Sequence, residues 1–438
     1  MTLFRSLMLA TAALWCFLAS ATSLSGRWSG ELSLGAQQLK LTINITEQPA
    51  GTFSATLDVP AQGANGIACS SVQVSGDQVS IAIDAIGAKY DGKIEENGNQ
   101  LSGTFAQSGM QLPLTLKRED MSKRQEPQPP YPYETREVTF GHDGITLAGT
   151  LTLPSGKGPH PAVLLVTGSG PQDRDETIFG HKPFLVIADY LTRHGIAVLR
   201  YDDRGVGGSS TASGYETTAD LALDAQSGIE WLKKCDGIDH NRIGMLGHSE
   251  GGCIAIMSAP QCSFIITLAG PAVKGKDLMI AQNRMMVETQ GGKWTPELQK
   301  QVTSIFTAID TAQSQKSLES TLRGIMGDDP NMTAQISALT SPWYVHFVQH
   351  DPTEDLKRIS CPMLALNGEW DSQVNCDQNL GAIRRLVPTA QVVALPGLNH
   401  ALQECPSKAQ SYNYAEIEQT ISPVVLDRIA DFIAKISK

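Results

Sequence analysis

The chain has 438 residues, of which 41% are hydrophobic and 18% are charged. This composition is typical of a globular protein and excludes an intrinsically disordered chain or a bundle of membrane helices. The net charge of -11, without a basic cluster, argues against nucleic acid or an anionic membrane as a partner.

The first 21 residues have the order of a secretory signal peptide. Arg5 precedes an apolar run from Leu7 to Leu18, and Ala19-Ser20-Ala21 supplies the small residues of a cleavage site. The run is too short to span a membrane, so we expect export to the periplasm or out of the cell, with no membrane span. The alternative is a buried N-terminal helix, for which no capping residue is present.

Residues 24–118 follow the pattern of an all-β domain. Short alternating segments such as Leu39–Ile45 and Val79–Ile83 are separated by turn residues at roughly ten-residue spacing. This spacing predicts a small barrel or a sandwich. Residues 119–135 are rich in charged residues, Gln and Pro, which predicts an extended, semi-rigid linker rather than one continuous domain.

Residues 136–438 predict an α/β domain with a mostly parallel, doubly wound sheet. Two alternating strands open it, and continuous apolar strands of the buried parallel kind follow, separated by helical patterns. The expected buried strands are Ala162–Val166, Ala197–Tyr201, Ile243–Leu246, Phe264–Leu268, Met363–Leu366 and Val392–Leu395. The expected helices are Pro183–His194, Thr218–Lys233, Gln378–Leu386 and Pro423–Ile436.

Residues 272–358 show helical stretches but no strand pattern. An insertion of this length needs its own structure, so we expect a helical cap over the carboxyl ends of the strands. Its aromatic residues and many methionines either line an acyl pocket or form the core of the cap.

The pentapeptide from Gly247 to Gly251 reads Gly-His-Ser-Glu-Gly and lies between an apolar strand and an apolar helix. A sharp strand-to-helix turn exposes its central residue and leaves no room for side chains two positions away. Ser249 is therefore the candidate nucleophile, with Gly247 and Gly251 as structural elbow residues. The alternative is a glycine-rich loop without chemistry.

A serine nucleophile needs a base and an acid, which in this kind of fold follow it on loops after later strands. His400 follows the last expected strand and is the candidate base, although a structural histidine is the alternative. Asp371 follows the strand before it and is the candidate acid, with Glu369 as a competitor on the same loop.

The developing oxyanion needs backbone donors. We expect one from Glu250, at the start of a helix, and one from Ser169 or Gly170 in the loop after Ala162–Val166, because Pro171 has no N–H. A phosphate cradle is the alternative for this loop, but the lysine and spacing of a P-loop are missing.

The chain has eight cysteines, of which Cys16 leaves with the signal peptide. The remaining seven lie far apart without a CxxC pair, so we expect no structural metal site. Cys376 and Cys405 follow the acid and base loops, which must meet, so a disulfide between them is predicted; the alternative is two separate thiols.

These segments resemble α/β-hydrolases of the serine aminopeptidase-like type, in particular bacterial carboxylesterases. The resemblance covers Glu137 to the C-terminus and is carried by the segments Gly168–Asp175, Gly247–Gly252, Leu268–Pro271 and Leu398–His400. It implies hydrolysis of small carboxylic esters, mostly of short acyl groups, through an acyl-enzyme and without a cofactor. A small aminopeptidase or amidase is one alternative, and a ligand-binding protein with an inert hydrolase domain is another.

Overall fold

The computed structural model describes residues 24, 26–34, 37–47, 52–59, 64–95, 98–107, 109–118, 125–327 and 332–436. The expected signal peptide lies outside the described residues. The described part of the chain divides into two compact units, residues 24–118 and 125–436. No helix within these ranges is long and apolar enough to cross a membrane.

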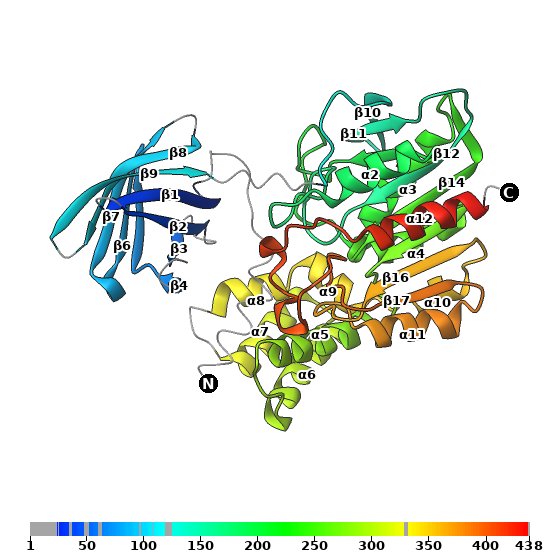
Figure 1. Cartoon of the computed structure of the whole chain (residues 1–438). Coiled ribbons are helices and arrows are strands. Elements are labelled where there is room, and N and C mark those ends of the chain that lie inside the picture. The colour runs from blue at the N-terminus through cyan, green and yellow to red at the C-terminus, as the bar shows by residue number, and fades with distance from the viewer. Residues whose placement is uncertain are drawn as a thin grey trace. The chain divides into compact units, whose positions relative to one another are not determined.

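The first unit is a closed antiparallel β-barrel (Figure 1). All of its nine described strands except β4 form a ring, which closes because β1 pairs with both β2 and β9, and β2 also pairs with β3. The strands are β1 (Gly26–Leu34), β2 (Gln37–Glu47), β3 (Phe53–Val59), β4 (Ala64–Ala68), β5 (Ser71–Ser75), β6 (Gln78–Ile83), β7 (Ala88–Glu95), β8 (Gln100–Gln107) and β9 (Met110–Arg118).

Alternate side chains of these strands pack inside the barrel as a hydrophobic core. Trp28 and Tyr90 are fully buried there. The Trp28 indole N–H donates to the carbonyl of Leu24 at 2.9 Å, and the Arg118 guanidinium lies 4.3 Å from the Trp28 ring centre. The barrel is thus the form that the all-β domain takes, rather than a sandwich.

The second unit is a sheet of eight described strands in the order β10-β11-β13-β12-β14-β15-β16-β17. The first two strands are antiparallel to their neighbours, and the remaining pairs are parallel. The bounds are β10 (Glu134–His142), β11 (Ile145–Leu153), β12 (His160–Val166), β13 (Ala197–Tyr201), β14 (Ile238–His248), β15 (Phe264–Leu268), β16 (Met363–Gly368) and β17 (Gln391–Leu395).

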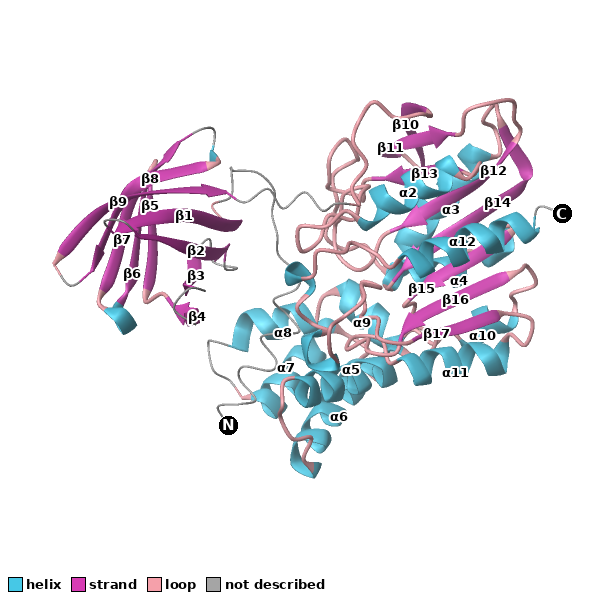
Figure 2. Ribbon diagram, viewed as in Figure 1, coloured by secondary structure: helices cyan, strands magenta, loops and turns pink. Residues whose placement is uncertain are grey.

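Helices cover both faces of this sheet, as Figure 2 shows. Adjacent residues of β12 belong to different cores, Val163 to the one that contains α2 and α12, and Leu164 to the one that contains α3, α4 and α11. Burial on both faces explains why the parallel strands are continuously apolar. The helices are α2 (Pro183–Arg193), α3 (Thr218–Leu232), α4 (Glu250–Met257), α11 (Cys376–Leu386) and α12 (Pro423–Ile436).

A helical insertion lies between β15 and β16, as expected for a cap. It consists of α5 (Gly275–Thr289), α6 (Pro296–Asp310), α7 (Gln315–Met326), α8 (Thr333–Leu339), α9 (Pro342–Gln349) and α10 (Thr353–Lys357). It has a separate core to which Met279 and Tyr344 belong and against which Trp343 packs. Several of the methionine and aromatic residues therefore hold the cap together.

The mostly parallel sheet with helices on both faces and a helical insertion, preceded by a small β-domain, confirms the fold class predicted from the sequence. The topology also positions the site, because the carboxyl ends of β12, β14, β16 and β17 reach the same edge of the sheet.

Candidate active site

Ser249 stands at a sharp turn between β14 and α4. Its backbone has φ of 53° and ψ of -121°, a left-handed conformation that costs a non-glycine residue free energy. A Cβ at Gly247 would overlap the carbonyl of Gly251, and a Cβ at Gly251 would overlap the carbonyl of Val166. Both flanking positions therefore require glycine, and the turn has the geometry of a nucleophile elbow.

The substitution Gly251→Ala tests this packing. We expect it to lower the free energy of unfolding by about 3 kcal/mol or more, because the methyl group meets the backbone of β12 and cannot move away. Gly381→Ala in the middle of α11 is the matched control, since a Cβ there meets no atom within 4 Å. It should raise the free energy of unfolding by roughly 0.5–1 kcal/mol. Urea unfolding of both variants measures the difference, and a stable Gly251→Ala protein would contradict the elbow geometry.

His400 and Asp371 meet Ser249 at the carboxyl edge of the sheet. His400 Nε2 lies 3.1 Å from Ser249 Oγ, and His400 Nδ1 lies 2.8 Å from Asp371 Oδ2. The other oxygen of Asp371 accepts the N–H groups of Gln373 and Val374 at 2.7 and 2.8 Å. The Asp371 carboxylate is thereby oriented so that His400 Nδ1 carries a proton and Nε2 can accept one.

The loop after β16 thus offers Asp371 and not Glu369 to the histidine. Asp371 is 5% exposed, whereas Glu369 is exposed to solvent. Among the described contacts, Glu369 has no hydrogen bond with His400.

The expected oxyanion donors belong to two segments that lie next to Ser249. Glu250 is the first residue of α4, where a backbone N–H has no partner within the helix. A Cβ at Gly168 would lie 3.2 Å from the Ser249 Cβ, which places the loop after β12 beside the nucleophile. The Gly168 N–H is already donated to Glu176 Oε1 at 2.8 Å, so Ser169 and Gly170 stay as the predicted second donor.

The Glu250 side chain joins the elbow to two neighbouring elements. It is buried, and its Oε1 accepts the Thr218 hydroxyl of α3 at 2.7 Å and the Trp343 indole N–H of α9 at 2.8 Å. Burial raises the pKa of Glu250, against the opposing effect of these hydrogen bonds and one from Ser169. The sequence did not indicate this connection between the elbow and the cap.

The charged loops after β12 and β13 bind each other. Arg174 pairs with Asp202 at 2.7 Å, and Asp203 Oδ2 accepts the Thr167 hydroxyl and the Gln172 N–H, both at 2.9 Å. Burial raises the pKa of Asp203 to about 8. These contacts brace the loop that carries Ser169 and Gly170.

The predicted disulfide between Cys376 and Cys405 is wrong, since both residues are free thiols. Cys376 begins α11 and points into the hydrophobic core beneath it, where its thiol contacts the carbonyl of Asn367 at 3.8 Å. The Cys405 thiol contacts the carbonyl of Gln403 at 3.5 Å. The acid and base loops do meet, but the chain beyond them leads the two thiols to different surroundings.

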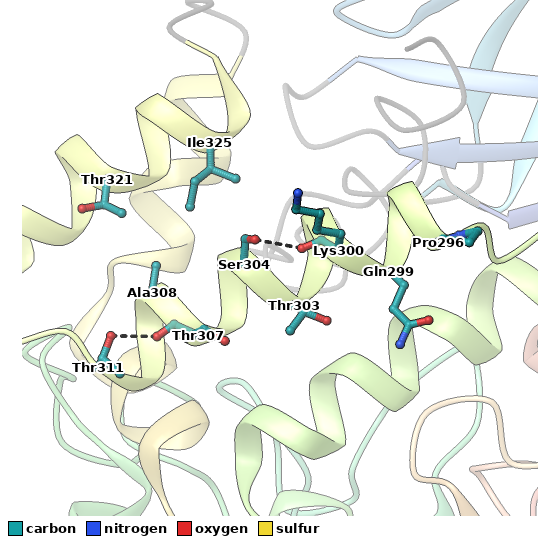
Figure 3. Close-up of a pocket in the computed structure, with 10 residues that line it drawn as sticks. All are labelled: Pro296, Gln299, Lys300, Thr303, Ser304, Thr307, Ala308, Thr311, Thr321 and Ile325. Carbon is teal, nitrogen blue, oxygen red and sulfur yellow. Dashed lines mark hydrogen bonds between the residues drawn. The ribbon is translucent and has the colours of Figure 1, made fainter.

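A groove of about 660 Å³ lies on the cap between α6 and α7, as Figure 3 shows. Serine and threonine side chains form much of its wall, and Lys300 lies at its edge. None of its lining residues belongs to the Ser249 site, so the groove is separate from the chemistry described above.

Comparison with known proteins identifies the family of the second unit. The model of the X-Pro dipeptidyl-peptidase (S15) family matches residues 143–397, which is more than half of the chain. Esterase EstD of Thermotoga maritima is 26% identical over 310 residues, covering 70% of this chain and 69% of that protein. Esterase FrsA of Yersinia enterocolitica is 33% identical over 147 residues, covering 32% of this chain and 33% of that protein.

Among solved structures, Est1E of Butyrivibrio proteoclasticus with bound ferulic acid is similar, with 18% identity and a TM-score of 0.44 over 69% of this chain and all of that one (100%).

The family match begins in the turn between β10 and β11 and extends beyond β17, so it includes the elbow, the Asp371 loop and the cap. The expected relationship to α/β-hydrolases is thereby confirmed. The chain is an α/β hydrolase and belongs to the X-Pro dipeptidyl-peptidase (S15) family.

Proposed function

We propose that the protein hydrolyses carboxylic esters, with a preference for short acyl groups, through a Ser249-His400-Asp371 triad. The observation that carries this proposal is the continuous chain of hydrogen bonds from Ser249 Oγ through His400 to Asp371. A serine hydroxyl in such an arrangement can be deprotonated as it attacks a carbonyl carbon.

The reaction proceeds in two halves. Ser249 Oγ attacks the ester carbonyl while His400 Nε2 takes its proton, and the N–H of Glu250, with that of Ser169 or Gly170, stabilises the oxyanion. His400 then gives the proton to the departing alcohol, which leaves an acyl group on Ser249. Water enters and attacks the acyl carbon while His400 removes a proton from it. His400 then returns this proton to Ser249 Oγ as the bond between the acyl group and Ser249 breaks, and the carboxylic acid departs. These steps require neither a metal nor an organic cofactor.

Two kinds of relative support different substrates. The curated relatives with the names EstD and FrsA are esterases, which favours an ester. The family description names an X-Pro dipeptidyl-peptidase, which makes an aminopeptidase or amidase the second candidate. The third possibility, a ligand-binding protein with an inert hydrolase unit, is disfavoured by the aligned Ser249, His400 and Asp371.

We also propose that residues 1–21 direct export, after which the mature enzyme works in the periplasm or outside the cell. The positively charged start, the apolar run and the small-residue site support this proposal. Expression of the whole chain in a bacterial host, followed by fractionation and N-terminal sequencing, tests it. We expect a mature chain that begins at Thr22, and an uncleaved cytoplasmic product would contradict the proposal.

A substrate panel separates the two enzymatic candidates. The purified protein is assayed with p-nitrophenyl acetate, butyrate and octanoate, and with alanyl and glycyl-prolyl p-nitroanilides. We expect the largest kcat/KM for the acetate or butyrate ester, and much smaller values for both anilides. A larger kcat/KM for either anilide would favour the peptidase. If the protein turned over none of these substrates and took up no fluorophosphonate, the binding protein would be favoured.

A further inference from the structure

A second carboxylate-histidine pair lies beside the triad and has no part in the steps above. Glu176 Oε1 is 2.9 Å from His248 Nδ1, and the two residues are 1% and 6% exposed. Glu176 lies in the loop after β12, and His248 is the last residue of β14, directly before Ser249. The ring centres of His248 and His400 are 4.9 Å apart.

Both nitrogens of the His248 ring face acceptors. Nδ1 faces the Glu176 carboxylate, and Nε2 lies 3.0 Å from the backbone carbonyl oxygen of His400. A neutral imidazole has only one N–H, so it can donate to one of these oxygens only. Glu176 Oε1 also accepts the Gly168 N–H, which favours a carboxylate there rather than an acid hydroxyl. The arrangement is satisfied when His248 is an imidazolium and Glu176 is ionised.

This pair connects three segments of the site. At one end Glu176 holds the Gly168 N–H, and therefore the loop that carries Ser169 and Gly170. At the other end His248 holds the carbonyl of His400. The covalent bond from His248 to Ser249 joins both contacts to the nucleophile elbow.

We propose that Glu176 and His248 form a buried ion pair that positions the oxyanion loop and the His400 loop around Ser249. Both are positioning residues, because they act on the reaction through Gly168 and His400 and not through the substrate. The inference rests on the proposed triad and assigns two positioning residues to its surroundings.

The surroundings of His248 support its cationic form. Burial by itself lowers the pKa of His248, but the attraction of Glu176 and the hydrogen bonds to Glu176 and to the His400 carbonyl raise it above its ordinary value. The titratable groups that face His248 are Glu176, His400 and, further off, Asp371. Glu176 also has a left-handed backbone with φ of 53°, a strain that its buried contacts must offset.

Two variants test the proposal, and a third serves as the control. Glu176→Gln keeps the size of the side chain but removes its charge, and His248→Asn removes the imidazolium. We expect each to lower kcat for p-nitrophenyl butyrate on the order of 10–100-fold, because small displacements of catalytic groups have effects of this size. KM should change little. His142→Asn is the control, since His142 makes a comparable 2.7 Å contact with buried Asp224, away from the site; it should leave kcat unchanged.

The pH profile separates positioning from a general loss of stability. In Glu176→Gln the His248 ring loses its counter-charge but stays buried, so its pKa should fall below the ordinary histidine value and its protonation should add a second inflection to kcat/KM at acidic pH. His142→Asn should keep the profile of the parent protein, even if its melting temperature falls equally. A Glu176→Gln enzyme with unchanged kcat and an unchanged profile would overturn the proposal.

A measurement on the unsubstituted protein covers the case in which the variants do not fold. The chain has nine histidines, and ¹⁵N-histidine NMR distinguishes rings with two N–H groups from neutral rings. We expect the His248 ring to keep both protons at a pH at which exposed histidines have become neutral. A neutral His248 at that pH would refute the ion pair. If the unsubstituted protein had no esterase activity and took up no fluorophosphonate, the proposed function would fail instead, while this protonation state could still hold.

Discussion

Substitution of Ser249 by alanine should abolish almost all turnover, with a decrease in kcat on the order of 10⁵–10⁶-fold. The alanine methyl group cannot attack a carbonyl, whereas the oxyanion donors and the ester-binding surface remain. KM should therefore change far less than kcat. Initial rates with p-nitrophenyl butyrate, measured over a wide range of enzyme concentration, give both constants.

The control for this result is Ser317→Ala. It removes a hydroxyl from the exposed first turn of α7, where Ser317 contacts the carbonyl of Ser314. We expect this variant to retain the parent rate. If Ser249→Ala retained more than a few per cent of the activity, Ser249 would not be the nucleophile.

Substitution of His400 by alanine should have an effect of similar size, on the order of 10⁴–10⁶-fold in kcat, because Ser249 then has no base. The double variant with Ser249→Ala should be no slower than the slower single variant, since the two residues act as one unit. His194→Ala, at the exposed end of α2, serves as the control and should keep full activity. Additive losses in the double variant would contradict the shared mechanism.

The pH dependence of the parent enzyme follows from the same role. A histidine base must be neutral to accept the proton of Ser249, and histidines take up a proton between about pH 8 and pH 5. We therefore expect kcat/KM to fall as the pH is lowered through this range. A flat profile down to pH 5, with chemistry as the slow step, would argue against His400.

The sequence predicted the features that depend on local pattern or on strand order. The elbow at Ser249 is local, because a strand, two glycines and a helix follow one another within a few residues. His400 and Asp371 could be placed because the carboxyl ends of parallel strands share one edge of the sheet, so loops after β16 and β17 must approach β14. The sequence favoured Asp371 but left Glu369 open, and the turn in which the N–H groups of Gln373 and Val374 orient Asp371 excludes the competitor.

Features that depend on the direction of side chains could not be predicted. Cys376 and Cys405 follow loops that meet, yet one thiol points into the core beneath α11 and the other does not. Glu176 and His248 are 72 positions apart, and their contact depends on how the loop after β12 folds back over β14. A histidine directly before the nucleophile was the available signal, but nothing local indicated its partner.

The closure of the β-domain depends on pairing between distant strands. Short alternating segments are equally compatible with a barrel and a sandwich, since both bury one side of each strand. The pairing of β1 with β9 decides the matter, because it joins the beginning of the unit to its end. Only Trp28 and Ser29 of β1 have partners in β9, so few residues carry this information.

Covalent labelling tests most directly whether Ser249 is an activated nucleophile. The purified protein is treated with a fluorophosphonate, digested with trypsin and examined by mass spectrometry. We predict one phosphonyl group per chain, located on Ser249 within the peptide from Ile243 to Lys274, with loss of esterase activity in proportion to labelling. Full labelling at another residue, or an active enzyme that takes up no label, would contradict the account.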